Sequence, residues 1–188
     1  VCSSDLYIKK AEKITLVHSA GITTFDSIQS LPLSVFEKIL KVNVTAPVYL
    51  NKAIIPLMKP GSSIIYIGST LAEKAVPNSF SYVTSKHAVI GLMRATCQDL
   101  MHNQIHTACI CPGFTDTPML RNLFQNEKNL EIVKKIQNRL IAPEEIAENY
   151  LCYSAKVRGI VRSYGMLKQT LEVLLKDDQE ANHSESDE

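Results

Sequence analysis

Glycine is scarce in this chain, with only seven in 188 residues. These glycines are scattered, so the sequence contains no Gly-x-x-x-Gly-x-Gly cluster. A glycine-rich turn of that kind lets the N-terminus of a helix receive the pyrophosphate of a dinucleotide. A phosphate-binding turn of this class is therefore missing from the sequence as given.

Long apolar runs and an excess of charge are missing too. No stretch approaches the roughly 18 apolar residues that cross a bilayer, and the formal net charge is +1. A balanced charge gives no reason to expect nucleic acid or a membrane surface as a partner. We expect a soluble, cytoplasmic protein that acts on a small molecule.

Disulfides and metal sites are also not indicated. Five scattered cysteines, an odd number, fit a reducing compartment better than a disulfide framework. Cys109 and Cys111 alternate on a predicted strand, where small side chains pack on one face.

His102 and His106 have the spacing of a metal pair, but no second ligand pair follows at the distance of a zinc site. We predict no metal.

What is present is an ordinary globular composition, 45% hydrophobic and 21% charged, in a chain long enough for one sizeable core. Short β-branched runs alternate with longer stretches of helical period. They predict strands at residues 14–18, 63–68 and 107–111, and helices at 33–57 and 81–101. This alternation predicts an α/β fold with a parallel sheet and right-handed crossovers.

Ser69, Tyr82 and Lys86 form the set with the clearest chemical meaning. A phenol has a pKa of about 10 and is a poor acid or base near neutral pH. Lys86 shares a helical face with Tyr82, so its ammonium is expected to lower that pKa. Ser69, at the end of an apolar run, offers a hydroxyl to an oxygen on which charge develops. We predict that Tyr82 is a general acid or base.

The Tyr-x-x-x-Lys spacing alone is weak evidence. It arises by chance in on the order of a third of chains this long. A second copy joins Tyr164 to Lys168, but Leu151 rather than serine lies thirteen positions upstream of that tyrosine. The serine at that offset favours the Tyr82 copy.

Together these residues resemble the classical short-chain dehydrogenase/reductase family. The family pattern has an upstream asparagine, a strand-end serine, Tyr-x-x-x-Lys opening a helix, and a Pro-Gly turn leading to a threonine. The matching residues outside the Ser-Tyr-Lys set are Asn43, Pro112, Gly113, Thr115 and Thr117. Four separated motifs agree in order, and the resemblance covers roughly residues 7 to 157.

The resemblance implies an oxidoreductase that uses NAD or NADP to interconvert an alcohol and a ketone or aldehyde. By analogy Tyr82 transfers the proton, Lys86 also holds the nicotinamide ribose, Ser69 orients the substrate oxygen, and Asn43 holds a relay water. Family members assemble through two long helices, so a homodimer or homotetramer is expected. The implied cofactor-binding residues are Ala20, Gly21, Tyr82, Lys86, Pro112, Gly113, Thr115 and Thr117.

The chain departs from the family pattern near its beginning. His18 and Ser19 stand where the family has two asparagines before Ala20 and Gly21, so the resemblance does not carry over the family's bracing of the sheet and cofactor contacts at this loop. The glycine-rich turn is also missing, so we expect a Rossmann-like, doubly wound parallel sheet lacking its first βαβ unit. The alternative is a non-catalytic sensor or scaffold that kept the site residues but cannot hold cofactor.

Pro47 lies inside the predicted helix at 33–57, close to Asn43. Proline removes a backbone hydrogen bond and tends to kink a helix. In the family a kink at this place exposes a backbone carbonyl to the relay water. The simpler interpretation is an interior asparagine solvated at a kink.

The remaining segments complete the expected organisation. Residues 1–6 match the translation of a sequencing adapter, and we interpret them as an assembly scar. Residues 7–175 form a partial catalytic domain, and residues 176–188 a disordered acidic tail. Residues 143–147 are a good helix start, and residues 159–161 part of a last strand.

Residues 116–139 match the family's substrate lid. Its apolar residues either bind a hydrophobic substrate or pack on the core: Met119, Leu120, Leu123 and Phe124.

Overall fold

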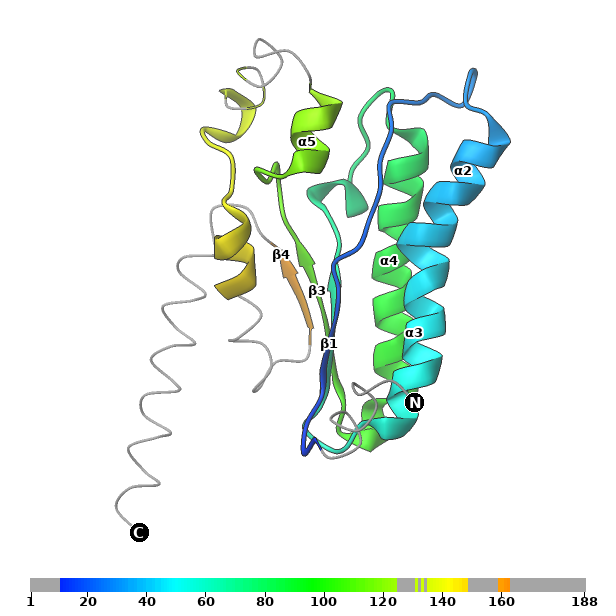
Figure 1. Cartoon of the computed structure of the whole chain (residues 1–188), viewed down its shortest axis with the longest axis vertical. Coiled ribbons are helices and arrows are strands. Elements are labelled where there is room, and N and C mark those ends of the chain that lie inside the picture. Colours follow the sequence, from blue (N-terminus) through cyan, green and yellow to red (C-terminus); the bar gives the residue numbers. More distant parts are fainter. Residues whose placement is uncertain (1–10, 125–130, 132, 134, 149–158, 163–188) are drawn as a thin grey trace.

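A parallel sheet lies at the centre of the protein. The computed structural model describes residues 11–124, 131, 133, 135–148 and 159–162 (Figure 1). Within these residues four strands pair in the order β1-β2-β3-β4, all parallel. The α/β, Rossmann-like fold class is thus confirmed. The strands are β1 (Thr15–His18), β2 (Ser63–Ile67), β3 (His106–Cys111) and β4 (Gly159–Arg162).

The predicted helix at 33–57 is one helical rod with a change of winding in its middle. It begins as α2 (Leu33–Leu40), passes through a π-helical segment η1 (Lys41–Thr45), and continues as α3 (Ala46–Ile54) and a short 3-10 turn η2 (Ile55–Leu57). Pro47 has no N–H to donate to the carbonyl of Asn43, four residues before it. The expected interruption therefore takes the form of a π-helical turn, a feature frequent at functional sites.

Helices cover both faces of the sheet (Figure 1). The rod and α4 (Phe80–Asp99) lie on one side, while α5 (Pro118–Leu123) and the helical residues 143–148 lie on the other. Alternate residues of β2 serve the two cores, because successive side chains of a strand point to opposite faces. Ile64 and Tyr66 pack against α4, whereas Ile65 packs toward Ile146.

His18 braces the end of β1 where the family asparagines are missing. Its Nε2 atom lies 2.8 Å from Asn51 Oδ1, and Asn51 Nδ2 donates a 2.6 Å hydrogen bond to the Tyr66 hydroxyl. The His18 and Tyr66 rings also contact each other, with centroids 4.9 Å apart. A buried polar network thus ties β1, β2 and α3 together, so the sheet keeps a brace of different chemistry.

Some predictions lie outside the described residues: the scar at 1–6, the tail at 176–188, and the second Tyr-x-x-x-Lys copy. The predicted last strand corresponds to β4, and the predicted helix start to residues 143–148. None of the helices in the described ranges is long and apolar enough to span a membrane. Those ranges also contain no group of three His, Cys, Asp or Glu side chains placed to hold a metal.

Candidate active site

Tyr82 and Lys86 lie on one face of the first turns of α4, as their spacing predicted. The ammonium nitrogen of Lys86 is 5.5 Å from the centroid of the Tyr82 ring. Lys86 is buried, and its Nζ atom donates a 2.8 Å hydrogen bond to the backbone carbonyl of Ile67, the last residue of β2. Burial lowers the pKa of Lys86 to about 8, although the neighbouring Cys109 and Cys111 act in the opposite direction.

Ser69 lies just after the end of β2, and its side chain forms a hydrogen bond with the Tyr82 phenol. Its hydroxyl also accepts a 3.1 Å hydrogen bond from Leu71 N and so caps a short 3-10 turn, η3 (Thr70–Ala72). Thr70 N donates to the carbonyl of Pro112 at 3.0 Å, which joins this turn to the end of β3. Strand β2, strand β3 and helix α4 therefore converge at Tyr82.

The predicted direction of the Tyr82 pKa was wrong. Burial raises this pKa above its ordinary value, and the hydrogen bond with Ser69, which lowers it, does not outweigh burial. The Lys86 ammonium donates to Ile67 and lies beside the phenol ring, so its charge is not directed at the phenol oxygen. The geometry thus holds Tyr82 in its protonated form at neutral pH.

Asn43 is held in the π-helical segment by a full set of hydrogen bonds. Its Oδ1 atom accepts from Ile22 N at 2.8 Å, and its Nδ2 atom donates to Ile22 O and to Ser85 Oγ, both at 2.9 Å. Ser85 Oγ in turn donates to the Tyr82 carbonyl at 2.8 Å. The Asn43 side chain therefore links the loop after β1 to the helix that carries Tyr82.

Ser85 was missed by the sequence prediction. It is fully buried and lies three residues after Tyr82, on the same face of α4. A small polar residue next to Lys86 on that face was the available signal. Its partner, Asn43, is 42 residues away in sequence, so only the folded chain identifies the contact.

Gly21 lies beside two of the predicted site residues. A β-carbon at this position would be 3.5 Å from Asn43 Oδ1 and 3.7 Å from Lys86 Nζ. The Lys86 ammonium has donors beyond the one given to Ile67 O, and these suit the hydroxyl groups of a ribose. Ala20, just before it, is exposed. The ribose side of the predicted cofactor site thus has fitting chemistry.

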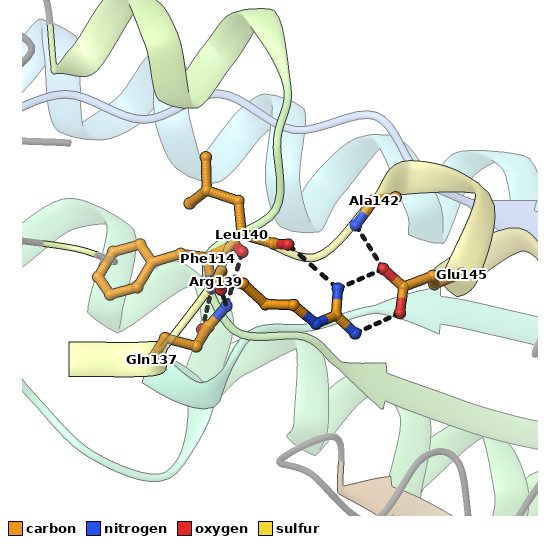
Figure 2. Close-up of polar contacts among 6 residues, drawn as sticks. All are labelled: Phe114, Gln137, Arg139, Leu140, Ala142 and Glu145. Carbon is orange, nitrogen blue, oxygen red and sulfur yellow. Dashed lines mark hydrogen bonds and ion pairs between the residues drawn. The ribbon is translucent and has the colours of Figure 1, made fainter. Parts of the chain in front are cut away.

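The Pro112-Gly113 turn is contacted by a residue that the sequence did not single out (Figure 2). Gln137 Oε1 accepts from Phe114 N at 2.6 Å, and Gln137 Nε2 donates to Phe114 O at 2.8 Å. A β-carbon on Gly113 would collide with Gln137 Oε1. In this structure the backbone of the turn is therefore paired with an internal carboxamide.

The segment after Gln137 is fixed to the same loop. Arg139 and Glu145 form a paired ion bridge with both N···O distances at 2.6 Å, and Glu145 Oε1 accepts from Ala142 N at 2.8 Å (Figure 2). Thr115 pairs with Ile141 in a parallel bridge. Residues 137–145 thus hold the loop that follows β3 through hydrogen bonds to Phe114 and the bridge at Thr115.

The predicted lid begins at α5. Thr117 caps this helix, since its Oγ1 atom accepts from Leu120 N at 3.3 Å. Leu120 is buried, whereas the Phe124 ring meets Phe25 and Phe114 edge-on, with centroids 5.7 and 6.3 Å apart. Leu120 therefore packs on the core, and Phe124 packs in an aromatic cluster beside the Pro-Gly turn. Substrate binding by the lid stays a prediction.

Cys109 and Cys111 lie beneath the site and are buried, as expected of packing residues. Their sulfur atoms are 3.8 Å apart, and a β-carbon on Gly68 would lie 2.8 Å from each of them. The hydrogen bond with Cys111 and burial both raise the pKa of Cys109. Gly68 is thus the residue that leaves room for two sulfur atoms under the end of β2.

Comparison with known proteins gives consistent matches. A family model described as enoyl-(acyl carrier protein) reductase matches residues 8–160. Dehydrogenase/reductase SDR family member 4 of Bos taurus is 32% identical over 144 residues, which cover 73% of this chain and 52% of the relative. The chain thus spans about half the length of the curated relatives it matches.

Solved structures match the fold. A short-chain dehydrogenase family protein from Francisella tularensis superposes with a TM-score of 0.77 at 28% identity, covering 88% of this chain and 76% of that one. The ligand-free aldohexose dehydrogenase of Thermoplasma acidophilum gives a TM-score of 0.77 at 27% identity, with coverages of 88% and 72%.

Proposed function

The chain belongs to the short-chain dehydrogenase/reductase family of oxidoreductases, and on that premise we propose that its site interconverts a small carbonyl compound and the corresponding alcohol. NAD or NADP is the proposed cofactor, and when bound it supplies or accepts the hydride. The observation that carries the proposal is the convergence of Tyr82, Ser69 and Lys86, brought together from α4 and the end of β2.

Tyr82 is the proposed proton donor or acceptor. Like an ordinary tyrosine, Tyr82 carries its proton at neutral pH and can donate it to a carbonyl oxygen as that oxygen gains charge, although burial raises its pKa and makes it a weaker acid. Ser69 offers the same oxygen a second hydrogen bond.

Lys86 and the glycine-bearing loops are the proposed cofactor contacts. The Lys86 ammonium and the open backbone at Gly21 suit ribose hydroxyls, because an ammonium supplies three donors and a glycine permits close approach. Asn43 fixes the loop at Ile22 and thereby the position of Gly21. Ala20 is a further proposed cofactor contact. The proposed contacts with the nicotinamide end are Pro112, Gly113, Thr115 and Thr117.

The proposed substrate is apolar around its carbonyl group. Phe25, Phe114 and Phe124 come from three different segments and meet edge-on beside the Pro-Gly turn. Rings in this arrangement give a flat hydrophobic molecule favourable contacts. A polar sugar would lose water there without gaining hydrogen bonds.

The wider setting is part of the same proposal. Residues 7–175 are the proposed catalytic domain, in a cytoplasmic protein. A homo-oligomer formed through the rod at 33–57 and α4 is supported by large apolar side chains exposed on that rod, among them Leu33 at 73% and Tyr49 at 71%. The alternative, a non-catalytic sensor or scaffold, is less favoured because the relatives that the chain matches are named dehydrogenases and reductases.

The experiment is a binding and turnover assay on the chain. Reduced cofactor fluorescence measures binding of NADH and NADPH, and loss of reduced cofactor measures turnover with a panel of apolar ketones and aldehydes. Tyr82→Phe should lower turnover by roughly 100-fold or more with cofactor affinity retained. Tyr164→Phe, in the second Tyr-x-x-x-Lys copy, is the matched control. Failure of the chain to bind either cofactor would favour the non-catalytic alternative.

A further inference from the structure

Helix α4 begins without a side-chain cap of its own. Ser79 stands at its N-cap position but makes no side-chain hydrogen bond to the helix. The first N–H groups of any helix have no partner within that helix and must find one elsewhere. For α4 this matters directly, because Tyr82 lies in the first turn.

Asp26, from the loop after β1, supplies those partners. Its Oδ1 atom accepts from Ser81 N at 3.0 Å, and its backbone carbonyl accepts from Phe80 N at 3.2 Å. Asp26 N in turn donates to Asn78 O at 3.1 Å. Three hydrogen bonds from one residue thus hold residues 78–81, directly before Tyr82.

The anchored segment contains a tight turn. Asn78 has a φ of +57°, in the left-handed region that asparagine adopts more readily than most residues. Asp26 is 55 residues from Ser81 in sequence and only 8% exposed. The conformation at the start of α4 is therefore set by tertiary contact with a buried aspartate.

The chemistry of Asp26 suits this place. A carboxylate next to the N-terminus of a helix interacts favourably with the partial positive charge there, and α4 is 20 residues long. Its second oxygen, Oδ2, is buried and has no hydrogen-bond partner among the described residues, and the same is true of the hydroxyl of Ser81. Such groups cost free energy. Retaining a carboxylate at this cost favours a positioning role over simple packing.

We propose that Asp26 is a positioning residue for Tyr82: it caps α4 from a distant loop and holds the first turn of the helix so that the phenol faces Ser69. The proposal rests on the proposed function in one respect, the role given to Tyr82. The same loop carries Phe25, whose ring contacts Phe124.

The test compares Asp26→Ala, Asp26→Asn and Ser81→Ala in the full chain. Amide hydrogen exchange at Phe80 and Ser81 should become at least about 10-fold faster in Asp26→Ala, because their acceptor or its support is removed. Asp26→Asn keeps the Oδ1 acceptor and should stay within about threefold of the wild-type rates. Ser81→Ala removes a hydroxyl without a partner and should change neither rate.

A second readout follows the phenol itself. Ultraviolet titration of Tyr82, taken as the difference from Tyr82→Phe, should show its pKa falling toward the ordinary value in Asp26→Ala, because the ring leaves its buried position. A variant that unfolds during the alkaline titration would also show a lower pKa, so far-ultraviolet circular dichroism is recorded at each pH and only the folded protein is compared. Asp26→Asn should restore the wild-type titration.

Two results would overturn the proposal: unchanged exchange at Phe80 and Ser81 in Asp26→Ala, or an unchanged Tyr82 titration. If Asp26→Ala does not fold, exchange in the wild-type chain decides, since unprotected Phe80 and Ser81 amides contradict the cap. Neither readout uses cofactor or substrate. If only turnover fails, that result contradicts the proposed function but not the proposal that Asp26 positions Tyr82.

Discussion

The Nζ atom of Lys86 donates a 2.8 Å hydrogen bond to the backbone carbonyl of Ile67. The ammonium is buried, and its pKa of about 8 lies below the ordinary value of 10.5. A pKa that is lower in the folded state means that the charged form is disfavoured by folding. The charged Lys86 side chain beside Tyr82 therefore lowers the free energy of unfolding.

Lys86→Met should raise the free energy of unfolding at pH 7 by roughly 1 to 3 kcal/mol, because removing the buried charge outweighs the lost hydrogen bond. The unfolded chain binds the lysine proton more tightly, so the wild type gains stability as pH rises from about 8 toward 10.5. The advantage of the variant should shrink over that window. Urea unfolding at neutral and alkaline pH measures both effects.

Lys52→Met, at an exposed position of α3, is the control and should show little change at either pH. A Lys86→Met protein less stable than the wild type at pH 7 would contradict the account of Lys86.

His18 should make the protein sensitive to mild acid. Burial lowers the pKa of His18, and the hydrogen bond with Asn51 only partly opposes this. Because the unfolded histidine has the higher pKa, its neutral form contributes full stability above about pH 6.5, and that contribution is lost as pH falls below this value. Thermal unfolding across this range should show the loss in the wild type.

In His18→Asn the acid-dependent loss should be smaller, because no proton is taken up at that position. His102→Asn, at an exposed position, should behave as the wild type does. Parallel pH profiles for His18→Asn and the wild type would refute this prediction.

Gly68→Ala should destabilise the protein by about 1 to 3 kcal/mol, because the new methyl group would meet two sulfur atoms in a packed interior. Combining it with Cys109→Ala and Cys111→Ala should recover part of that loss by making room. Urea unfolding of the single, double and triple variants gives the coupling.

Gly91→Ala is the matched control, since a β-carbon at Gly91 within α4 meets nothing within 4 Å. An alanine there should stabilise the protein by about 0.5 to 1 kcal/mol. A loss at Gly91 equal to that at Gly68 would mean that the sulfur contacts do not cause the effect.

Asn43→Ala should cost roughly 2 to 4 kcal/mol of stability, because it leaves buried groups of Ile22 and Ser85 without partners. A double-mutant cycle with Ser85→Ala should give a coupling above about 0.5 kcal/mol, as expected for residues in one hydrogen-bond network. Additive effects within that margin would show that Asn43 and Ser85 act separately.

Much of the fold was predictable from local pattern. The runs at 14–18, 63–68 and 107–111 became β1, β2 and β3 with boundaries shifted by a residue or so, because short apolar runs between turn signals are a local signal for buried strands. The change to π-helical winding near Asn43 was foreseen only as a kink. Pro47 predicts that one backbone hydrogen bond of the helix is missing, but it does not predict how the helix changes its winding around that position.

The site was predictable to the extent that it lies within one element. Tyr82 and Lys86 share a face because helix geometry fixes that relation. The direction of the Tyr82 pKa was not predictable, because it depends on how far the phenol is removed from water and on where the ammonium points. Gln137 was missed for a similar reason. Nothing in the local sequence indicates that its carboxamide lies against the backbone of Gly113.

The sequence by itself determined the order of strands and helices and the chemical groups available to the site, since periodicity and spacing are properties of the local chain. The tertiary structure decided which distant groups meet: Asp26 at the start of α4, Asn43 at Ser85, and His18 at Asn51. Hydrogen bonds and burial act over a few ångströms in space and not along the sequence. Contacts between residues dozens of positions apart therefore exist only once the chain has folded.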